Sequence, residues 1–411
     1  MLDIDLIRNN PEEVKQGISK KGADPKLVDD FLALDKEWRE LTKEADNLRA
    51  RQNELSIQRN IEEGKKVKIQ VQEIETTLRK LEANRQEILS QIPNLPAADV
   101  PQGKDESANV VVKKVGEPAK FDFEPKDYLT LAGDLIDTER AAKVSGSRFG
   151  YVFGDIVLLE IALVKFVFDR LVPHGFIPVL PPVLVKPEVM RGMGKIKFIE
   201  DGDAFFIEKD NLYLVGSAEH SIGPIHMNEV LDQKSLPKRY LGFSTSFRRE
   251  AGSYGKDTKG ILRVHQFDKA EMFSFALPSQ SEEEHQFLLA RQEELMQALG
   301  IPYQVVQIST GDMGFTDYKQ YDIEAWLPGE RRYRESHSCS NTTDFQAQGI
   351  NVKYRSPDGR TEFVHMLNAT AFAMGRTLIA ILENYQTKEG RIVIPEVLRD
   401  YVGKAEIEFQ K

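Results

Sequence analysis

Residues 241–275, LGFSTSFRREAGSYGKDTKGILRVHQFDKAEMFSF, decide the fold of this chain. Residues 243–249 and 262–275 are rich in aromatic side chains, whereas residues 250–260 hold three glycines, a serine and an aspartate. Two such stretches around a polar, glycine-containing segment predict a β-hairpin with a long loop.

Charged side chains gather on one face of this predicted hairpin. Because side chains alternate along a strand, Arg248 and Glu250 share a face, as do Arg263, Phe267 and Glu271 on the partner strand. Unpaired buried charge costs several kcal/mol, so this face is suited to a charged ligand. Arg248 suits a phosphate, Phe267 with Arg263 a flat base, and Glu271 a substrate ammonium. From spacing alone, a solvated hairpin with incidental salt bridges is an equally open alternative.

The segment FRREAGSYGKDTKGILRVHQFDKAEMF resembles the motif 2 hairpin of seryl-tRNA synthetases, class II enzymes that activate serine with ATP and load it onto tRNA. The resemblance implies an α+β fold, in which an antiparallel-sheet catalytic domain follows an N-terminal antiparallel coiled-coil arm. It also implies ATP and L-serine as substrates and tRNA(Ser) as the acceptor, and it leaves open whether tRNA(Sec) is a second acceptor. The ATP-binding residues that it implies in this hairpin are Arg248, Arg249, Glu250, Arg263, Val264 and Phe267.

Composition sets bounds that agree with such an enzyme. The chain has 411 residues, 41% hydrophobic and 29% charged, enough for a large core and a smaller unit. A single cysteine excludes a disulfide framework, and we expect a cytoplasmic protein with neither signal peptide nor membrane span. The net charge of -10 argues against DNA and general nucleic-acid binding, so an RNA partner needs a local basic surface.

Two long heptad patterns precede the hairpin. Apolar residues recur at alternating three- and four-residue spacing over residues 31–55, with a break at Gln52, and over residues 67–92, with a break at Arg85. They predict two antiparallel helices, each about 45 Å long, joined near residues 62–64. The basic residues expected near the tip, which we assign to tRNA binding, are Arg49, Arg51, Arg59, Lys65, Lys66 and Lys68.

On its own this arm would indicate a scaffold protein, because heptads usually form structural or interaction elements. In seryl-tRNA synthetases the corresponding arm grips the tRNA. After it, the segment IPNLPAADVPQGKDESANV carries Pro93, Pro96 and Pro101, which exclude a continuous helix. We therefore expect an arm over residues 1–100 and a catalytic domain over residues 101–411.

The segment GFIPVLPPVLV, from Gly175, resembles class II motif 1, with Pro182 at the position of the family's proline. In that family the segment pairs two subunits, so the resemblance implies a homodimer. An apolar strand entering the core of a monomer would have the same composition.

Two further segments resemble the family's serine pocket. In LYLVGSAEHSIG, Ser217, Ala218 and Glu219 stand where the family usually has Thr-Ala-Glu, and in the later segment FVHMLNATAFAMGRTL, Asn368 and Thr370 match pocket positions. With Glu271 these residues form the implied serine site. Serine at position 217 keeps the hydroxyl and loses a methyl group.

The segment RRYRESHSCSNTTDFQAQ, from Arg331, resembles the part of the family that holds ATP and Mg²⁺. The resemblance places Glu335, Ser336, His337 and Ser338 at ATP, with Glu335 and Ser338 as Mg²⁺ ligands, whose oxygen atoms suit this cation. His337 could be a base or ligand, but a hydrogen-bonded bystander is the more common role of a lone histidine. Cys339 is expected to be a packed thiol.

Arg376 follows a predicted strand at residues 365–367 and lies near the start of an apolar helix. A cation at a helix N-terminus opposes the macrodipole and calls for a compensating anion. In the resemblance it is the motif 3 arginine, which binds the γ-phosphate. Arg248, Glu271 and Arg376 are thus the residues expected to carry catalysis, by position and charge.

Two other functions fit parts of the sequence. One is an ATP-dependent ligase that loads an amino acid onto a carrier protein, which would not need a basic-tipped arm. The other is a coiled-coil interaction protein with a decayed synthetase core, against which the joint presence of the site residues argues.

Overall fold

The computed structural model describes residues 1–252 and 259–408, so the middle of the predicted motif 2 loop lies outside the described residues. The chain divides into two compact units, Met1–Leu95 and Pro96–Lys411, here called the N-terminal and C-terminal units. Residues 96–100, which the sequence placed with the arm, belong to the second unit. There Ala97 and Val100 pack against Met313 and its neighbours, so apolar burial sets the boundary.

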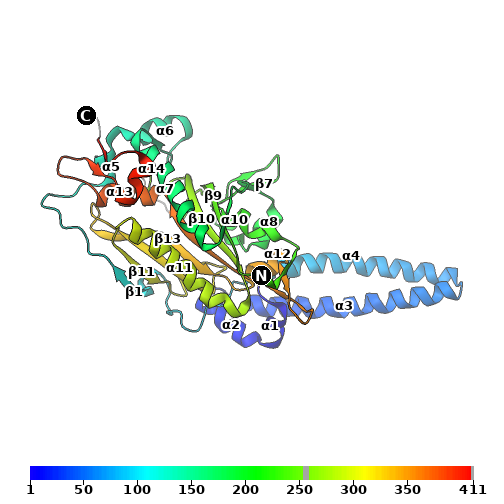
Figure 1. The fold of residues 1–411 in the computed structure, drawn as a ribbon. Helices are drawn as coiled ribbons and strands as arrows, with labels where there is room; N and C mark the ends of the chain where they lie inside the picture. Colours follow the sequence, from blue (N-terminus) through cyan, green and yellow to red (C-terminus); the bar gives the residue numbers. More distant parts are fainter. Residues whose placement is uncertain (253–258, 409–411) are drawn as a thin grey trace. The chain divides into compact units, whose positions relative to one another are not determined.

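The N-terminal unit is entirely helical, and its two longest helices run side by side (Figure 1). The predicted junction near residues 62–64 is wrong by a few residues. The turn lies between Ile57 and Ile61, where Arg59 has a φ of 55° and the Asn60 side chain accepts a hydrogen bond from the Glu63 N–H at 3.3 Å. This N-cap starts the second long helix before Gly64. The helices are α1 (Ile4–Asn9), α2 (Pro11–Lys20), α3 (Lys26–Ile57) and α4 (Ile61–Gln91).

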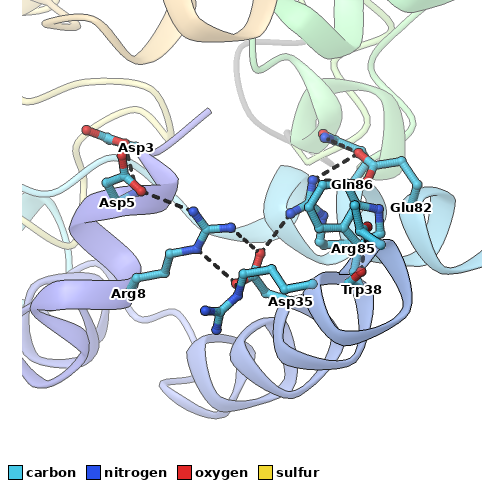
Figure 2. Close-up of polar contacts among 10 residues, drawn as sticks. Asp3, Asp5, Arg8, Asp35, Trp38, Glu82, Arg85 and Gln86 are labelled. Atoms are coloured by element: carbon cyan, nitrogen blue, oxygen red, sulfur yellow. Dashed lines mark hydrogen bonds and ion pairs between the residues drawn. The ribbon is translucent and has the colours of Figure 1, made fainter. Parts of the chain in front are cut away.

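A buried ionic cluster ties α1, α3 and α4 together (Figure 2). The Asp35 side chain is inaccessible and accepts hydrogen bonds from Arg8 at 2.8 and 2.9 Å and from Arg85 at 2.7 Å. The Arg85 guanidinium also lies 4.2 Å from the centroid of the Trp38 ring. The heptad break at Arg85 is therefore a buried position whose charge is neutralised by the facing helix.

An eight-stranded sheet organises the C-terminal unit, with the order β1-β11-β12-β13-β16-β10-β9-β4. All neighbours are antiparallel except β4 and β9. The predicted strand at residues 365–367 is the start of a nine-residue strand. The strands of this sheet are β1 (Val110–Val115), β4 (Phe176–Val179), β9 (Lys238–Phe247), β10 (Gln266–Ala276), β11 (Tyr303–Gln307), β12 (Lys319–Leu327), β13 (Arg332–Asn341) and β16 (His365–Ala373).

Short strands form the four smaller sheets β2-β3, β5-β7-β6, β8-β14-β15 and β17-β18. Their bounds are β2 (Ile136–Asp137), β3 (Tyr151–Val152), β5 (Leu184–Val185), β6 (Phe206–Ile207), β7 (Leu212–Leu214), β8 (Val230–Asp232), β14 (Lys353–Arg355), β15 (Thr361–Phe363), β17 (Ile392–Val393) and β18 (Glu406–Ile407).

Helices cover the large sheet and close its core. Helix α11 packs on β13 and β16, and helix α13 packs on β10 and β12 and against α7. One apolar cluster joins these elements and includes Phe166, Leu288, Phe372 and Leu378. The helices of this unit are α5 (Tyr128–Ala132), α6 (Thr138–Ser145), α7 (Asp155–Leu171), α8 (Pro187–Gly192), α9 (Ile196–Glu200), α10 (Glu219–Ile222), α11 (Ser281–Ala298), α12 (Phe345–Ile350), α13 (Met374–Asn384) and α14 (Arg399–Val402).

One glycine lets a helix lie directly on the sheet. A Cβ atom at Gly242 of β9 would lie 2.1 Å from Cδ1 of Ile222 in α10 and 3.6 Å from Cβ of Ala218. The missing side chain therefore allows α10 to approach the strand closely. This contact brings Ser217 and Glu219 over β10. Within the described ranges no helix has the length and apolar composition needed to cross a membrane.

Candidate active site

Charged residues occupy the middle of β10, a central strand that is almost wholly buried. Lys269 and Glu271 are 7% and 1% exposed and form an ion pair. A central strand is normally apolar, so two buried charges there mark a functional site.

Several cavities lie along this part of the sheet and share walls with a central one. One of about 120 Å³ meets the central cavity at Ile261, Val264, Phe267 and Gly375. The central cavity, about 90 Å³, shares Arg248, Lys269 and Ser338 with a cavity of about 380 Å³ beside α10, the α10 cavity. It also shares Leu262, Arg263, Glu335 and Arg376 with a third cavity of about 470 Å³, the arginine cavity. Among the residues the structure describes, the α10 and arginine cavities share none. The order is therefore α10 cavity, central cavity, arginine cavity.

Three of the junction cations are paired with carboxylates, whereas Arg248 donates from Nε to the Gly216 carbonyl at 3.0 Å. The Arg376 guanidinium lies 2.9 Å from the Glu335 carboxylate, Arg263 lies 2.8 Å from Glu250, and Lys269 contacts Glu271. The positive charge of Arg376 lowers the pKa of Glu335, so this carboxyl group is ionised at neutral pH. Charged substrates would find cations and anions already desolvated and oriented.

The predicted serine-binding residues converge on Glu271. Ser217 donates a hydrogen bond from its hydroxyl to the Glu271 carboxylate at 3.2 Å, and Asn368 lines the α10 cavity. Burial raises the pKa of Glu271, which the neighbouring Lys269 ammonium opposes. Glu271 lines none of the three cavities, but it contacts Ser217 and Lys269, which both line the α10 cavity.

Glu219 of α10 lines the α10 cavity, and Thr370 of β16 lines the adjoining central cavity. The Glu219 carboxylate lies 2.7 Å from the Lys195 ammonium and accepts a hydrogen bond from Gln346 at 2.7 Å. Burial would raise the pKa of Glu219, but the Lys195 ammonium, with His220 and the hydrogen bond from Gln346, together outweigh burial and lower the pKa to about 2. Thr370 lines the central cavity, whereas Ala218 is fully buried beneath α10 and lines none of the three cavities.

Most of the predicted ATP-binding residues of motif 2 line the central cavity: Arg248, Glu250, Arg263, Val264 and Phe267. At the loop the strands stop earlier than predicted, at Phe247 on β9 and at Gln266 on β10, so Arg248 and Arg263 lie just beyond them. The Arg248 guanidinium lies over the Phe267 ring, 5.4 Å from its centroid. Arg263 is instead paired with Glu250.

Arg249 is turned away from this site. It donates from Nε to the Ala204 carbonyl at 3.2 Å and lies over the Phe205 ring at 4.3 Å. It lines none of the three cavities. Neighbouring residues on an extended segment point to opposite sides, which explains why Arg248 and Arg249 part.

On β13 the strand register shifts opposite Glu335 and His337, so the side chains do not alternate strictly between the cavities and the core. Ser338 and Glu335 line the central cavity, as does Ser336, whose hydroxyl donates to the Ile323 carbonyl at 3.0 Å. His337 is 1% exposed, and its burial lowers the pKa to about 3. It is a neutral core histidine against Phe372. Cys339 is fully buried, and burial raises the pKa of its thiol.

The oxygen donors near Glu335 fit a magnesium ion. Glu335 and Ser338 line one cavity with Arg248 and Arg376, and hard oxygen ligands suit Mg²⁺. The described residues contain no cluster of three or more His, Cys, Asp or Glu side chains that could hold a metal. Two protein ligands with phosphate and water oxygens are a common arrangement for Mg²⁺.

Three charged residues near the site escaped the sequence interpretation. Asp322 of β12 pairs with Ser338 in the strand register, and burial raises its pKa well above the ordinary value, with Glu335 as the next cause. Lys269 and Lys195 line the α10 cavity. Lys269 could have been found from its spacing, since it lies two positions before Glu271 on the same strand face.

In the N-terminal unit, the six basic residues assigned to the tip differ in their surroundings. Arg49 is paired with Asp46 and Glu75, both at 2.9 Å, and Arg51 with Glu63 at 3.3 Å. Within the described part of the chain, Arg59, Lys65, Lys66 and Lys68 have no carboxylate partner. They are the stronger candidates for phosphate contacts.

Comparison with known proteins identifies the class from both units. Residues 204–385 match the core domain of class II tRNA synthetases for G, H, P, S and T, and residues 1–96 match the seryl-tRNA synthetase N-terminal domain. The fold and site are those of a class II aminoacyl-tRNA synthetase.

The relatives narrow this class to one family. A serine–tRNA ligase of Dictyoglomus turgidum is 43% identical over the full length of both chains. The crystal structure of seryl-tRNA synthetase from Pyrococcus horikoshii complexed with ATP covers both chains fully, with 40% identity and a TM-score of 0.93. The cytoplasmic serine-tRNA ligase from Naegleria fowleri in complex with AMP has 34% identity and a TM-score of 0.89, over 100% of this chain and 99% of that one. The chain belongs to the seryl-tRNA synthetase family. Likeness over both units favours this function over a carrier-protein ligase or a decayed core.

Proposed function

We propose that this protein activates L-serine with ATP to form seryl-adenylate and then transfers the seryl group to tRNA(Ser). The observation that carries this proposal is the order of the three cavities, with cations at both junctions. Serine binds in the α10 cavity and the nucleotide in the central cavity. The two substrates then meet at Arg248 and Lys269.

Activation is an in-line displacement at the α-phosphorus. A serine carboxylate oxygen attacks from the α10 cavity, the bond from the α-phosphorus to the β-phosphate oxygen breaks, and pyrophosphate leaves with the electron pair. Arg248 neutralises the α-phosphate and Arg376 the γ-phosphate, so the enzyme contributes position and charge. Glu335 and Ser338 would hold a Mg²⁺ ion, which supplies further neutralisation of the phosphates.

Selection of serine depends on polar groups around Glu271. The substrate ammonium replaces Lys269 as the partner of the Glu271 carboxylate, while Ser217 and Asn368 meet the substrate's polar groups. A site that binds a hydroxyl rejects alanine because buried polar groups would stay unpaired, by a factor of about 10⁴ in favourable cases. Arg263 and Phe267 contribute to the base site.

The acceptor reaches the same cavity. Its volume of about 380 Å³ leaves room beyond a single serine, and its rim carries Lys197 and Phe198 of α9. The terminal ribose hydroxyl of the tRNA attacks the seryl carbonyl there and loses its proton, the bond from the carbonyl carbon to the phosphate oxygen breaks, and AMP leaves with the electron pair. Arg59, Lys65, Lys66 and Lys68 of the arm contact the tRNA backbone. Charging of tRNA(Sec) would follow from the same contacts where that tRNA exists.

A homodimer completes the proposal. Helix α7 exposes Leu158 and Ile161. The predicted motif 1 segment, which includes strand β4, exposes Ile177 and Leu180, and Leu180 is 80% exposed. Such a concentration of exposed apolar residues is typical of a subunit interface.

Pyrophosphate exchange with each of the amino acids, with and without tRNA, tests the activity. We expect exchange with serine alone, independent of tRNA. Exchange with another amino acid in preference to serine, or none at all from folded protein, would contradict the proposal.

A further inference from the structure

His220 is a buried histidine of the α10 cavity that the proposed chemistry does not use. It is the second residue of α10, it is 5% exposed, and it lines the cavity beside Ser217 and Glu219. Burial lowers the pKa of His220 to about 3, and the neighbouring Lys195 ammonium acts in the same direction. The imidazole is therefore neutral at neutral pH, and one of its two nitrogen atoms is a hydrogen-bond acceptor.

The accepting nitrogen of His220 holds the backbone in front of α10. Its Nδ1 atom accepts a hydrogen bond from the Gly216 N–H at 3.1 Å. At the other end of the same peptide unit, the Val215 carbonyl accepts a hydrogen bond from the N–H of Phe247, the last residue of β9, at 2.8 Å. The peptide unit between Val215 and Gly216 is therefore held from both sides, by α10 and by β9.

The next peptide unit along the chain holds Arg248. The Gly216 carbonyl accepts a hydrogen bond from Arg248 Nε at 3.0 Å, which leaves both Nη atoms of the guanidinium for a phosphate. Arg263, Lys269 and Arg376 share their charge with carboxylates. The carbonyl is neutral, so it orients Arg248 without cancelling the charge that the α-phosphate needs.

Position 216 is a glycine for a steric reason. A Cβ atom there would lie 2.6 Å from Cζ of Phe198 and 3.2 Å from Cε1 of His220. These two rings pack edge to face, with 5.5 Å between their centroids. Because glycine has no side chain to restrict its backbone, the direction of its carbonyl depends on the hydrogen bond that fixes its N–H.

We propose that His220 is a positioning residue, which fixes the Gly216 peptide so that the Gly216 carbonyl aims the Arg248 guanidinium at the α-phosphate. The inference rests on the proposed function, in which Arg248 neutralises the α-phosphate during adenylate formation. His220 acts only through Gly216 and Arg248. A displacement of about 1 Å in such a group can lower a rate about 100-fold.

A narrower role would be to cap α10, because side chains at the start of a helix often accept a free backbone N–H there. A cap of this kind would affect the stability of α10 and the shape of the serine site. It would not act through the side chain of Arg248, so the two roles predict different kinetics.

The test compares His220→Phe with His220→Asn in the full-length protein, with His226→Phe as the control. Phenylalanine keeps a ring against Phe198 and removes the acceptor, whereas the amide oxygen of asparagine reaches the place of Nδ1. His226 contacts Glu229 and Tyr240 and lines none of the three cavities. Hydroxylamine traps the activated serine as a hydroxamate, which gives kcat and the KM values for ATP and serine without tRNA.

We expect His220→Phe to lower kcat about tenfold or more, with changes of less than about threefold in the KM for ATP and in the KM for serine. His220→Asn should stay within about threefold of the wild type, because it restores the acceptor. His226→Phe should keep the wild-type kcat. The melting temperatures of all three variants show whether each one is folded.

The variant Arg248→Lys provides a second background, because it keeps a cation and removes the Nε donor. There His220→Phe should lower kcat less than about twofold, since no bond from Nε to the Gly216 carbonyl is left to disturb. Equal losses in both backgrounds would overturn the inference. A loss in His220→Asn as large as in His220→Phe, or a rise in the KM for serine without a fall in kcat, would also overturn it.

Should His220→Phe fail to fold, His220→Gln takes its place in the same comparison, because its amide reaches the position of Nε2 and not that of Nδ1. Wild-type protein without serine-dependent hydroxamate formation would instead overturn the proposed function.

Discussion

At the scale of single residues, the site consists of charges that neutralise one another. Arg376 is paired with Glu335, Arg263 with Glu250 and Lys269 with Glu271. A buried charge without a partner costs several kcal/mol, so these pairs keep the site stable until substrates exchange with them. Binding and stability are therefore linked at each pair.

The Lys269–Glu271 pair gives a first prediction. Glu271→Gln should lower serine-dependent adenylate formation about 100-fold, because the substrate ammonium loses a charged partner. It should also destabilise the fold by about 3 kcal/mol, since Lys269 stays buried without a carboxylate. Hydroxamate formation and thermal melting measure the two effects.

The double variant Glu271→Gln with Lys269→Met separates the effect on activity from the effect on stability. It removes both buried charges, so we expect stability to recover while activity stays low. Recovery of activity in the double variant, or near-normal activity in Glu271→Gln, would contradict the role of Glu271.

The Asp35 cluster gives a second prediction at this scale. Arg85→Ala should destabilise the N-terminal unit by about 3 kcal/mol or more, because it opens the buried pair with Asp35 and removes the guanidinium from Trp38. Arg39→Ala is the control, since Arg39 also contacts Asp35 but is 53% exposed. Equal melting temperatures for the two variants would show that burial of Arg85 does not matter.

At the scale of elements, the arm and the sheet perform separate tasks. Helices α3 and α4 have their own apolar contacts, among them Leu55, Val67 and Val71 near the turn. The cavities are built from β10, β12, β13 and β16 with the segments around them. We therefore expect changes in the arm to leave the chemistry of activation intact.

Removal of residues 43–78, with a short glycine-rich loop in their place, tests this separation. The deletion keeps Asp35, Trp38 and Arg85, so the base of the arm stays folded. Serine adenylation should remain near the wild-type rate, whereas aminoacylation of tRNA should fall at least 100-fold, because the phosphate contacts of the arm are lost. Equal loss of both activities would indicate a structural arm, and full aminoacylation would indicate that the arm serves another partner.

The charges at the tip allow a finer comparison. Neutralising Arg59, Lys65, Lys66 and Lys68 should flatten the salt dependence of tRNA binding by up to about 0.9 in slope per lost phosphate contact. Neutralising Arg49 and Arg51, whose side chains are paired with carboxylates, should change the slope less per residue. If both sets of substitutions changed the salt dependence equally per residue, the ion pairs of Arg49 and Arg51 would have to open without cost when tRNA binds.

At the scale of the whole molecule, buried titratable groups set how stability depends on pH. Burial lowers the pKa of His220 and His337 to about 3 and that of His285 to about 4, and it raises the pKa of Glu160 and Glu383 to about 7. Below pH 6.5 the unfolded chain binds protons at histidines that stay neutral in the folded chain. The free energy of unfolding therefore decreases as the pH is lowered. The glutamates have the opposite effect between about pH 4.5 and 7.

His285→Gln isolates one of these contributions. Between about pH 6.5 and 4, the wild type should lose about 1.4 kcal/mol per pH unit more than the variant, because His285 takes up one proton on unfolding. Glutamine retains a donor for the Cys339 carbonyl, which accepts from His285 Nε2 at 3.0 Å. Calorimetric melting of both proteins from pH 7 to 5 measures the difference, and parallel pH profiles would contradict it.

The sequence by itself predicted the two long helices, the motif 2 hairpin and many of the residues that line the cavities. Heptad spacing defined two long helices, because a repeat of apolar residues marks the face that a helix buries. The segments that resemble motif 2 and motif 3, together with the β13 segment, contain six residues that line the central cavity: Arg248, Glu250, Arg263, Phe267, Glu335 and Arg376. Local spacing indicates which face of an element is buried and which is polar. The ligands assigned to those residues came from the resemblance to the family.

Only the tertiary structure decided which faces meet. It buried Arg85 against Asp35, turned Arg249 to Phe205 and placed His337 in the core, because those outcomes depend on partners far away in the sequence. It added Lys269 and Asp322 to the site through strand pairing, and it placed the central cavity next to the α10 and arginine cavities, which no spacing along the chain encodes. Charge pairing and cavity order arise from long-range packing, whereas sequence periodicity reports only short-range geometry.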